Sequence, residues 1–353
     1  MLDADNPKIY KQIDPSNMRA QLHDFPRQCM EAWQKALAFE LPPDYAKVNK
    51  IMILGMGGSA IGGDLVQSFY QSKLKVTFSV NRDYGLPAFV DSNTLVIASS
   101  YSGNTEETLS AFGEALKTDC KKLVMTTNGA LKGMAENAGV PIFHIEHVSQ
   151  PRAALGYSFM PLIAFLYNMG LLKEKPDVDE MVQTLNALLT ELEENIPCKT
   201  NEAKQIAAEM YGKIPVLYGA GILSEVAHRW KTQINENSKS TAFYETLPEL
   251  NHNSVVGYQF PAEPTSNLYV VFLRCPSLHP RTLLRYKVTS DLLEQNGINY
   301  QIVDGTGEDE LSQIMGLIFL GDWVSYYLAI LYEIDPTPVK SIDYLKKKLK
   351  YSK

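Results

Sequence analysis

Hydroxyl side chains crowd the segment Ser99–Thr108 in a pattern that suits the binding of a phosphate group. Three hydroxyl residues surround one glycine there: Ser100, Ser102, Thr105 and Gly103. Hydroxyl groups and the free backbone N–H groups at the start of a helix can hold a phosphate without a lysine. The segment is not a Walker loop, because the pattern G-x-x-x-x-G-K-[ST] is absent. A capping box built on Asn104 and Glu107 is the simpler alternative, but it leaves the other hydroxyls unexplained.

A glycine-rich segment, Gly55–Gly63, is a second candidate for anion binding. It follows a short apolar stretch and predicts a tight turn at the carboxyl end of a strand, where Gly57 and Gly58 let a ligand approach the backbone. The segment also matches the dinucleotide pattern G-x-G-x-x-A, and Asp83 stands at a suitable distance beyond it. Arg82 lies beside that acid, which argues against the dinucleotide alternative.

Short apolar stretches alternate with polar segments that permit helices. The predicted strands of the first half are Lys50–Gly55, Leu74–Val80, Thr94–Ser99, Lys122–Thr127 and Val140–Ile145. The second half gives strands at Lys213–Gly221, Asn267–Arg274 and Ile298–Asp304, and helices at Ile222–Asn235, Pro280–Gln295 and Gly307–Ile334. Such alternation predicts βαβ units and parallel sheets covered on both faces. The fold class is therefore α/β.

The length of 353 residues suggests about two domains. The N-terminal segment is expected to be helical, with Met18–Ala38 interrupted near Pro26, and Val339–Leu349 to form a final basic helix. The expected divisions are a helical segment at 1–48, a first α/β domain at 49–172, a helical connector at 173–200 and a second α/β domain at 201–353.

Composition and charge exclude several classes of protein. The chain carries 33 Lys and Arg against 40 Asp and Glu, and this net charge of −7 argues against nucleic-acid binding. The longest apolar stretch, Ile314–Leu331, is broken by Asp322 and Ser325, so we expect no membrane helix. The first residues lack the pattern of a signal peptide. Four scattered cysteines without a CxxC pair fit a reducing cytoplasm.

The loop Ser100–Thr108 resembles the signature of the sugar isomerase (SIS) domain, and the whole chain resembles the bifunctional phosphoglucose/phosphomannose isomerase family. Four further segments carry the closer match: Gly55–Ser59, Pro151–Leu155, Asn235–Lys239 and Leu247–Asn253. The resemblance implies two SIS domains, each a mainly parallel sheet flanked by helices. It also implies a homodimer with active sites at the subunit interface, and interconversion of an aldose 6-phosphate with fructose 6-phosphate.

Aldose–ketose isomerisation moves a proton between C2 and C1 through a cis-enediol. It needs a base, an acid–base group at the ring oxygen, and a cation beside the developing negative charge. The resemblance assigns these three roles to Glu236, His252 and Arg152, with Glu236 expected just after a helix. Glu245 and Glu249 are competing carboxylates that the resemblance does not place in this role.

The resemblance implies further contacts with the substrate. The residues expected to hold the 6-phosphate are Ser59, Ser100, Ser102 and Thr105. In the last helix Lys346 is implied to assist ring opening or to hold the sugar, and Lys340 is an alternative. The lysines around Lys346 are more typical of a solvated face: Lys347, Lys348 and Lys350. Thr337 matches a family threonine that is associated with accepting mannose.

No cofactor or metal is expected, because the chemistry requires none and His144 and His147 have no third ligand nearby in the sequence. A regulator built from non-catalytic SIS domains is the main alternative, but it would not need the combination of base, histidine and arginine. A dinucleotide-dependent oxidoreductase would explain Gly55–Gly63 and not the hydroxyl loop. The expected partners are sugar 6-phosphates and a second copy of the chain.

Overall fold

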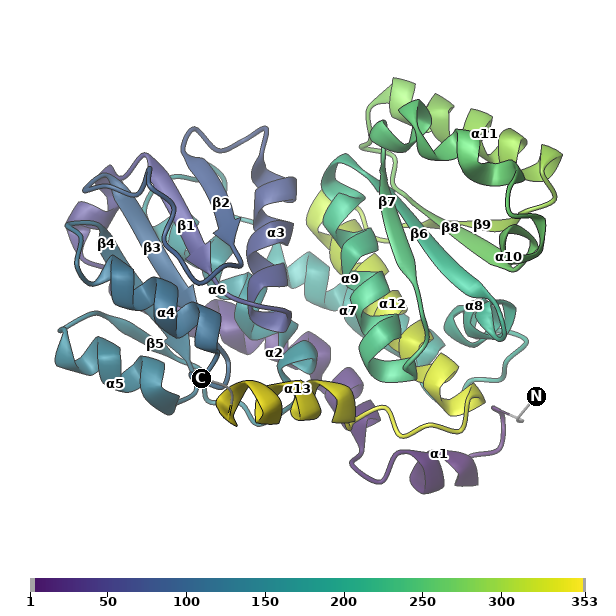
Figure 1. Cartoon of the computed structure of the whole chain (residues 1–353), viewed down its shortest axis with the longest axis horizontal. Coiled ribbons are helices and arrows are strands. Elements are labelled where there is room, and N and C mark those ends of the chain that lie inside the picture. The colour runs from purple at the N-terminus through teal and green to yellow at the C-terminus, as the bar shows by residue number, and fades with distance from the viewer. Residues whose placement is uncertain (1–3, 352–353) are drawn as a thin grey trace. The chain divides into compact units, whose positions relative to one another are not determined.

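The computed structural model describes residues 4–351, which form two compact units (Figure 1). The N-terminal sheet unit consists of Asp24–Gln183 and Gly221–Glu225. The C-terminal sheet unit consists of the chain up to His23, Thr184–Ala220 and the chain from Val226 onward. Each unit holds one parallel sheet flanked by helices, so the predicted α/β fold is confirmed. The domain boundaries expected from the sequence remain predictions.

The sheet of the N-terminal unit has five parallel strands in the order β2-β1-β3-β4-β5. The strands are β1 (Lys50–Leu54), β2 (Thr77–Asn81), β3 (Thr94–Ser99), β4 (Lys121–Thr126) and β5 (Ile142–His144). They coincide with the apolar stretches predicted as strands, because central parallel strands are buried on both faces and carry continuous apolar runs.

Helices cover both faces of this sheet (Figure 1). They are α2 (Met18–Leu37, from Asp24 onward), α3 (Gly58–Tyr70), α4 (Glu106–Ala115), α5 (Gly129–Asn137) and α6 (Leu155–Asn168), with the short turns η1 (Pro43–Lys47) and η2 (Pro151–Ala153). Met52 and Leu54 of β1 share one buried apolar cluster with side chains of α4 and α5. On the opposite face, α3 brings Gly63 against Ile53.

The sheet of the C-terminal unit has four parallel strands in the order β7-β6-β8-β9. The strands are β6 (Ile214–Ala220), β7 (Phe243–Leu247), β8 (Leu268–Arg274) and β9 (Asn299–Asp304). The helices are α1 (Lys8–Ile13), α7 (Val178–Leu192), α8 (Glu202–Met210), α9 (Ser224–Ser238), α10 (Ala262–Ser266), α11 (Pro280–Gln295), α12 (Glu310–Leu331) and α13 (Lys340–Tyr351). Figure 1 shows α11 on one side of this sheet and α8, α9 and α12 on the other.

Strand β7 and helix α2 differ from the prediction. Strand β7 was not expected, since it lies at an edge and only Leu247 of its five residues is buried. Helix α2 continues through Pro26 without the expected interruption. A proline removes one backbone hydrogen bond, but Leu22, Phe25 and Cys29 are buried on either side of it. This packing compensates for the lost bond.

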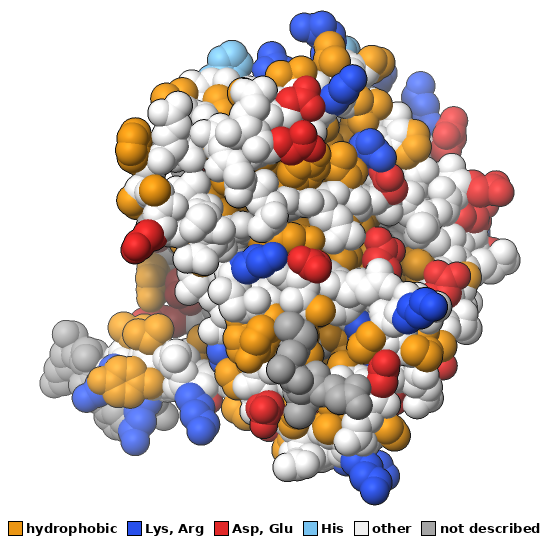
Figure 2. Space-filling view, turned by 90° about the vertical axis from the view of Figure 1, so that its right-hand side faces the viewer, with side chains coloured by type: hydrophobic (Ala, Val, Ile, Leu, Met, Phe, Trp, Pro, Cys, Tyr) orange, Lys and Arg blue, Asp and Glu red, His pale blue; other side chains and the backbone are white. Residues whose placement is uncertain are grey.

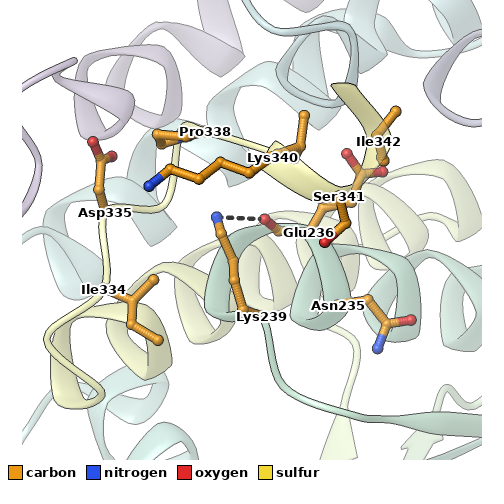
Figure 3. Close-up of a pocket in the computed structure, with 10 residues that line it drawn as sticks. Asn235, Glu236, Lys239, Ile334, Asp335, Pro338, Lys340, Ser341 and Ile342 are labelled. Carbon is orange, nitrogen blue, oxygen red and sulfur yellow. Dashed lines mark hydrogen bonds between the residues drawn. The ribbon is translucent and has the colours of Figure 1, made fainter. Parts of the chain in front are cut away.

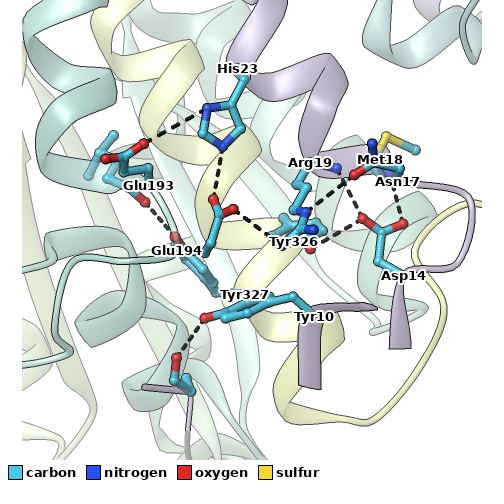
Figure 4. A network of polar contacts seen from close by, with 12 residues as sticks. Tyr10, Asp14, Asn17, Met18, Arg19, His23, Glu193, Glu194, Tyr326 and Tyr327 are labelled. Carbon is cyan, nitrogen blue, oxygen red and sulfur yellow. Dashed lines mark hydrogen bonds and ion pairs between the residues drawn. The ribbon is translucent and has the colours of Figure 1, made fainter. Parts of the chain in front are cut away.

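Polar contacts tie α1 and the start of α2 into the C-terminal unit (Figure 4). The Asp14 carboxylate accepts hydrogen bonds from the first backbone N–H groups of α2, at 2.8 and 3.1 Å, and Tyr326 of α12 donates to it at 3.2 Å. Glu194 accepts from Arg19 at 3.2 Å and lies 2.8 Å from the His23 ring. The hydrogen bond to Glu194 raises the pKa of His23. The N-terminal segment is thus held by charge pairs as well as by apolar packing.

Helix α12 is the core helix of the C-terminal unit. By length and composition it could cross a membrane, but its most apolar stretch is entirely buried inside the fold. The sequence placed Asp322 and Ser325 within this stretch, and both have buried partners. Asp322 accepts two hydrogen bonds from Arg229, at 3.0 and 3.2 Å, and Ser325 accepts one from Asn237 at 2.9 Å. These contacts fix α9 against α12.

Candidate active site

The hydroxyl loop lies in the N-terminal unit between β3 and α4. Two of its hydroxyl oxygens are close together, with 2.9 Å between Ser100 Oγ and Thr105 Oγ1. The loop turns at Gly103, whose φ of +66° and backbone N–H bond to Ser100 O at 3.0 Å close the turn. Ser102 is exposed at the surface of the loop. The first turn of α4 starts directly behind these groups and presents its free N–H groups and the positive end of its dipole.

The capping-box alternative is not what the structure contains. Helix α4 begins after Thr105, whose side chain makes no capping hydrogen bond and instead contacts Ser100. Asn104 faces a different helix, since its Oδ1 accepts from Ala130 N of α5 at 3.1 Å. The hydroxyl groups are therefore not consumed by helix capping. They remain available to a ligand at the start of α4.

The glycine-rich loop after β1 contacts the hydroxyl loop. Ser59 Oγ, in the first turn of α3, accepts a hydrogen bond from Tyr101 N at 3.0 Å, so Ser59 adjoins the loop that carries Ser100. Gly57 is exposed and has a φ of +49°. Because the strand order reverses between β1 and β3, both loops leave the sheet at its topological switch point, where α/β sheets bind ligands.

Arg152 belongs to the same neighbourhood. It sits in the short turn η2 and is buried, with 3% of its surface exposed. A Cβ atom at Gly58 would lie 2.7 Å from Pro151 O and 3.1 Å from Arg152 N, so only glycine allows this approach. The structure therefore brings together five of the predicted site residues within one unit: Ser59, Ser100, Ser102, Thr105 and Arg152.

Arg82, the residue that argued against a dinucleotide site, pairs with Asp64 of α3, with a hydrogen bond of 3.0 Å from its Nη1. Asp83 lies beyond the end of β2 and is exposed. The acid does not end the second strand, as the dinucleotide alternative would require.

Glu236 lies in the C-terminal unit, within the last turn of α9 and not after it. The prediction that the helix ends at Asn235 is wrong, because contacts with other elements extend it. Asn237 binds Ser325 of α12, and Lys239 ends the helix with a φ of +56°. The Lys239 ammonium donates to the carbonyl oxygens of Glu236 at 2.8 Å, Asn237 at 3.1 Å and Pro336 at 2.8 Å. Such contacts satisfy the last carbonyl groups of a helix.

Glu236 lines a cavity of about 540 Å³ (Figure 3). The other lining residues are Asn235, Lys239, Ile334, Asp335, Pro338, Val339, Lys340, Ser341 and Ile342. Lys340 extends along the wall toward Asp335 and Pro338, and the Lys239 ammonium points to the backbone of Glu236 (Figure 3). Thr337 belongs to the turn beside this cavity, and its N–H is bound to Asp335 Oδ1 at 2.9 Å. Two carboxylates, two lysines and apolar walls are suited to a polar ligand of sugar size.

The two candidate lysines of α13 have different surroundings. Lys340, at the start of the helix, is part of the cavity wall beside Glu236. Lys346 is exposed further along α13, on a helix whose apolar residues Tyr344 and Leu345 are also exposed, at 61% and 58%. In Figure 2 this helix is at lower left, where lysine side chains lie beside hydrophobic ones.

His252 is in a different part of the C-terminal unit. It ends the turn η4 (Glu249–His252) beyond the carboxyl end of β7 and is exposed. Its neighbour Asn251 anchors the turn, donating to Thr289 Oγ1 at 2.8 Å and accepting from Arg285 at 3.2 Å. The competing carboxylates Glu245 and Glu249 accept hydrogen bonds within this region, from Ser254 at 2.5 Å and Asn253 at 2.9 Å.

Several residues with evident roles at the site escaped the sequence analysis. Lys239 fixes the end of α9, and its place in the segment Asn235–Lys239 was the available signal. Tyr101, inside the hydroxyl loop, and Gln28 of α2 contact the segment that carries Arg152. For these two no sequence signal exists, because their partners are far away in the chain.

Comparisons with known proteins agree with this architecture. Residues 199–349 match the family described as bacterial phospho-glucose isomerase C-terminal SIS domain. A Caldicellulosiruptor bescii protein named bifunctional phosphoglucose/phosphomannose isomerase is 42% identical over 334 residues, which cover 94% of this chain and 98% of that protein. An Aquifex aeolicus protein of the same name is 38% identical over 313 residues, with coverage of 88% and 93%.

A solved structure shows the same fold. A hypothetical protein from Thermus thermophilus superposes with a TM-score of 0.74 at 17% identity, and the match covers 99% of this chain and 94% of that chain. The extent and identity of the sequence matches confirm the resemblance stated above, including the two SIS-type domains. The chain therefore belongs to the bifunctional phosphoglucose/phosphomannose isomerase family and is an isomerase.

Proposed function

We propose that this protein interconverts glucose 6-phosphate and mannose 6-phosphate with fructose 6-phosphate through a cis-enediol. One observation carries the proposal: the loops with Ser59 and Ser100–Thr105 and the turn with Arg152 converge at the switch point of one sheet. This arrangement supports a phosphate site at the hydroxyl loop, with the turn that carries Arg152 beside it. The relatives named above carry both aldose activities in their names.

The 6-phosphate is held by the four hydroxyl residues, Ser59, Ser100, Ser102 and Thr105, and by backbone N–H groups, with Gly57 and Gly58 beside the sugar. This anchors an unreactive end of a flexible molecule. The entropic cost of aligning C1 and C2 with the catalytic groups is therefore met largely by phosphate binding.

Glu236 acts as the base. Its carboxylate removes the proton from C2 of the open-chain aldose, and the electrons of that C–H bond form the enediolate. A proton then passes from the C2 hydroxyl to the C1 oxygen, and the carboxylic acid returns its proton to C1, so that C2 becomes the carbonyl carbon of the ketose. Arg152 lowers the energy of the enediolate because its charge is fixed and already in place when the negative charge develops.

His252 opens the sugar ring by giving a proton to the ring oxygen as the bond from that oxygen to C1 breaks, and the C1 hydroxyl releases its proton to water. Lys346 assists this step or holds the sugar. Glucose and mannose 6-phosphates differ only at C2 and share one enediol. A single base serves both if the substrate rotates near C2–C3, and Thr337 favours the mannose form.

The active protein is a homodimer in which His252 reaches the active site of the neighbouring subunit. The positions of Glu236 and His252 support this proposal. Glu236 precedes the amino end of β7 and His252 follows its carboxyl end, so the five residues of β7, about 17 Å at the rise of a strand, lie between them. This separation along β7 favours the supply of the two groups by different chains.

Apolar side chains surround the His252 turn. Val256 and Phe260 after it are 78% and 79% exposed, and Leu284 and Val288 of α11 are 46% and 50% exposed. Leu284 and Val288 also line a cavity of about 320 Å³ next to Asn251. Exposed apolar residues gathered in this way are typical of a subunit interface.

All four cysteines are among the described residues and form no disulfide, which fits the proposed cytoplasmic location.

We expect fructose 6-phosphate to form from glucose 6-phosphate and, in a separate assay, from mannose 6-phosphate, with chelator present. Formation from both establishes the two activities, and formation from one narrows the substrate range. Sugar-phosphate binding without turnover of either would contradict the proposal and favour a SIS-domain regulator.

Mixed dimers test the sharing of His252. Glu236→Gln and His252→Asn chains are each expected to be inactive alone. When they are co-expressed with different tags and purified as heterodimers, one of the two sites regains a complete set of groups, so activity returns to about half that of the wild-type dimer. No recovery would show that both groups act within one chain.

A further inference from the structure

The segment that carries Arg152 has little structure of its own. It runs from the end of β5 to the start of α6 and contains only the short turn η2. Two backbone hydrogen bonds close this turn, from Ala153 N to Gln150 O at 2.8 Å and from Ala154 N to Pro151 O at 3.2 Å. Contacts with other elements must therefore set the position of the arginine.

Tyr101 of the hydroxyl loop holds one end of this segment. Its hydroxyl donates to His147 O at 2.5 Å and accepts from Ser149 N at 2.9 Å. The backbone of Tyr101 is itself fixed, because its N–H binds Ser59 Oγ at 3.0 Å and its carbonyl accepts from Thr127 Oγ1 at 2.7 Å. One residue thus connects both phosphate-holding loops to the segment that precedes Arg152.

Gln28 of α2 holds the other end. Its Nε2 donates to Ala153 O at 2.9 Å, and its Oε1 accepts from Gly156 N at 2.7 Å. The side chain is 1% exposed, and a Cβ at Gly156 would lie 2.8 Å from Gln28 Oε1. The glycine therefore admits the amide to the two backbone groups that follow Arg152.

The ring of His147 completes the hydrogen bonding of this amide. Its Nε2 lies 3.3 Å from Gln28 Nε2, so the imidazole accepts the second amide proton when that nitrogen carries none. Burial lowers the pKa of His147, which favours this neutral form. Every donor and acceptor of Gln28 then has a partner, as a buried amide requires.

We propose that Tyr101 and Gln28 are positioning residues, which clamp the Arg152 segment at both ends and keep the arginine in register with the phosphate loops. The inference rests on the proposed role of Arg152 at the enediolate. Neither residue has to touch the reacting carbons. A displacement of the arginine by about 1 Å is enough to lower the rate by about a hundredfold, because the charge must meet the oxyanion at a fixed distance from the anchored phosphate.

Tyr101→Phe tests the clamp, because it removes the hydroxyl and keeps the ring. Two inhibitors separate the two ends of the site: D-arabinonate 5-phosphate, whose carboxylate resembles the enediolate, and D-arabinitol 5-phosphate, which is neutral at that end. We expect the inhibition constant of the aldonate to rise about tenfold and that of the alditol to change less than about twofold. Inhibition constants do not depend on the fraction of folded protein, so a general loss of stability would not produce this split.

Two further variants sharpen the result. Gln28→Met should produce the same split from the other end of the segment. In the Arg152→Met background, Tyr101→Phe should have no further effect on the aldonate, because the two substitutions remove one interaction. Tyr45→Phe is the matched control, since Tyr45 donates an equivalent hydroxyl bond to Lys122 O at 2.6 Å in the same unit. It should leave both inhibition constants unchanged.

Other outcomes overturn the proposal. An equal rise of both inhibition constants would show that Tyr101 affects only the binding of the phosphate. No change in either constant would show that its hydroxyl does not position the arginine. If the proposed isomerase function itself were wrong, the results would differ from these outcomes. In that case the wild-type protein would show no isomerase activity and would bind the aldonate no more tightly than the alditol.

Discussion

Replacement of Glu236 by glutamine should lower kcat for isomerisation by about a thousandfold and leave KM close to the wild-type value. Glutamine has the size of glutamate but cannot accept a proton from C2. The assay is fructose 6-phosphate formation from each aldose, together with exchange of a C1 hydrogen of fructose 6-phosphate for deuterium, followed by NMR in heavy water. Loss of exchange along with loss of turnover would assign the proton transfer itself to Glu236.

The control variants are the two competing carboxylates. Glu245→Gln and Glu249→Gln change side chains that accept hydrogen bonds from Ser254 and Asn253, away from those lining the Glu236 cavity. Each should retain kcat within about a factor of three, as expected for a group outside the proton transfer. A larger loss in either control than in Glu236→Gln would show that the base has been assigned to the wrong carboxylate.

The expected loss depends on how firmly α9 holds this glutamate. The last turn of the helix is bound to α12 through Asn237 and to the Asp335–Pro338 turn through Lys239. A base on a rigid helix end keeps one geometry toward C2 and C1, which proton transfer in both directions requires. A variant at position 236 therefore tests chemistry and not flexibility.

Apolar patterning predicted the strands that matter most for the site. β1 and β3 are buried parallel strands with unbroken apolar runs, and the loops that follow them contain the glycines and hydroxyls. The elements that the sequence predicted poorly were those whose structure depends on contacts with distant parts of the chain. β7 is a half-exposed edge strand, and the last turn of α9 exists because Asn237 and Lys239 find partners near residues 325 and 336.

The candidate site also contains residues that the sequence could identify and residues that it could not. Residue types that must face a phosphate or move a proton could be selected from the sequence, with the family resemblance assigning their roles. Tyr101 and Gln28 could not be selected, because a tyrosine in a loop and a glutamine in a helix acquire their importance only from contacts 46 and 125 residues away. Long-range hydrogen bonds of this kind have no local sequence signature.

Gly103→Ala should weaken binding of the phosphate end of the substrate at least tenfold and destabilise the fold by about 3 kcal/mol. A Cβ at this position would lie 1.6 Å from the backbone oxygen of Asn128, and the φ of +66° disfavours any side chain. The oxygen cannot move away freely, because it accepts from Thr126 Oγ1 at 2.9 Å. The loop must therefore shift, and Ser100 and Thr105 lose their common geometry.

Affinity for D-arabinitol 5-phosphate, which is recognised mainly through its phosphate, and the midpoint of thermal unfolding measure the two effects. Gly133→Ala is the matched control in the same unit, because a Cβ there meets no atom within 4 Å. Gly133 lies inside α5, where alanine is the better helix former, so this variant should gain about 0.5–1 kcal/mol of stability and keep its affinity. If Gly103→Ala were destabilised and still bound the alditol phosphate normally, the hydroxyl loop would not be the phosphate site.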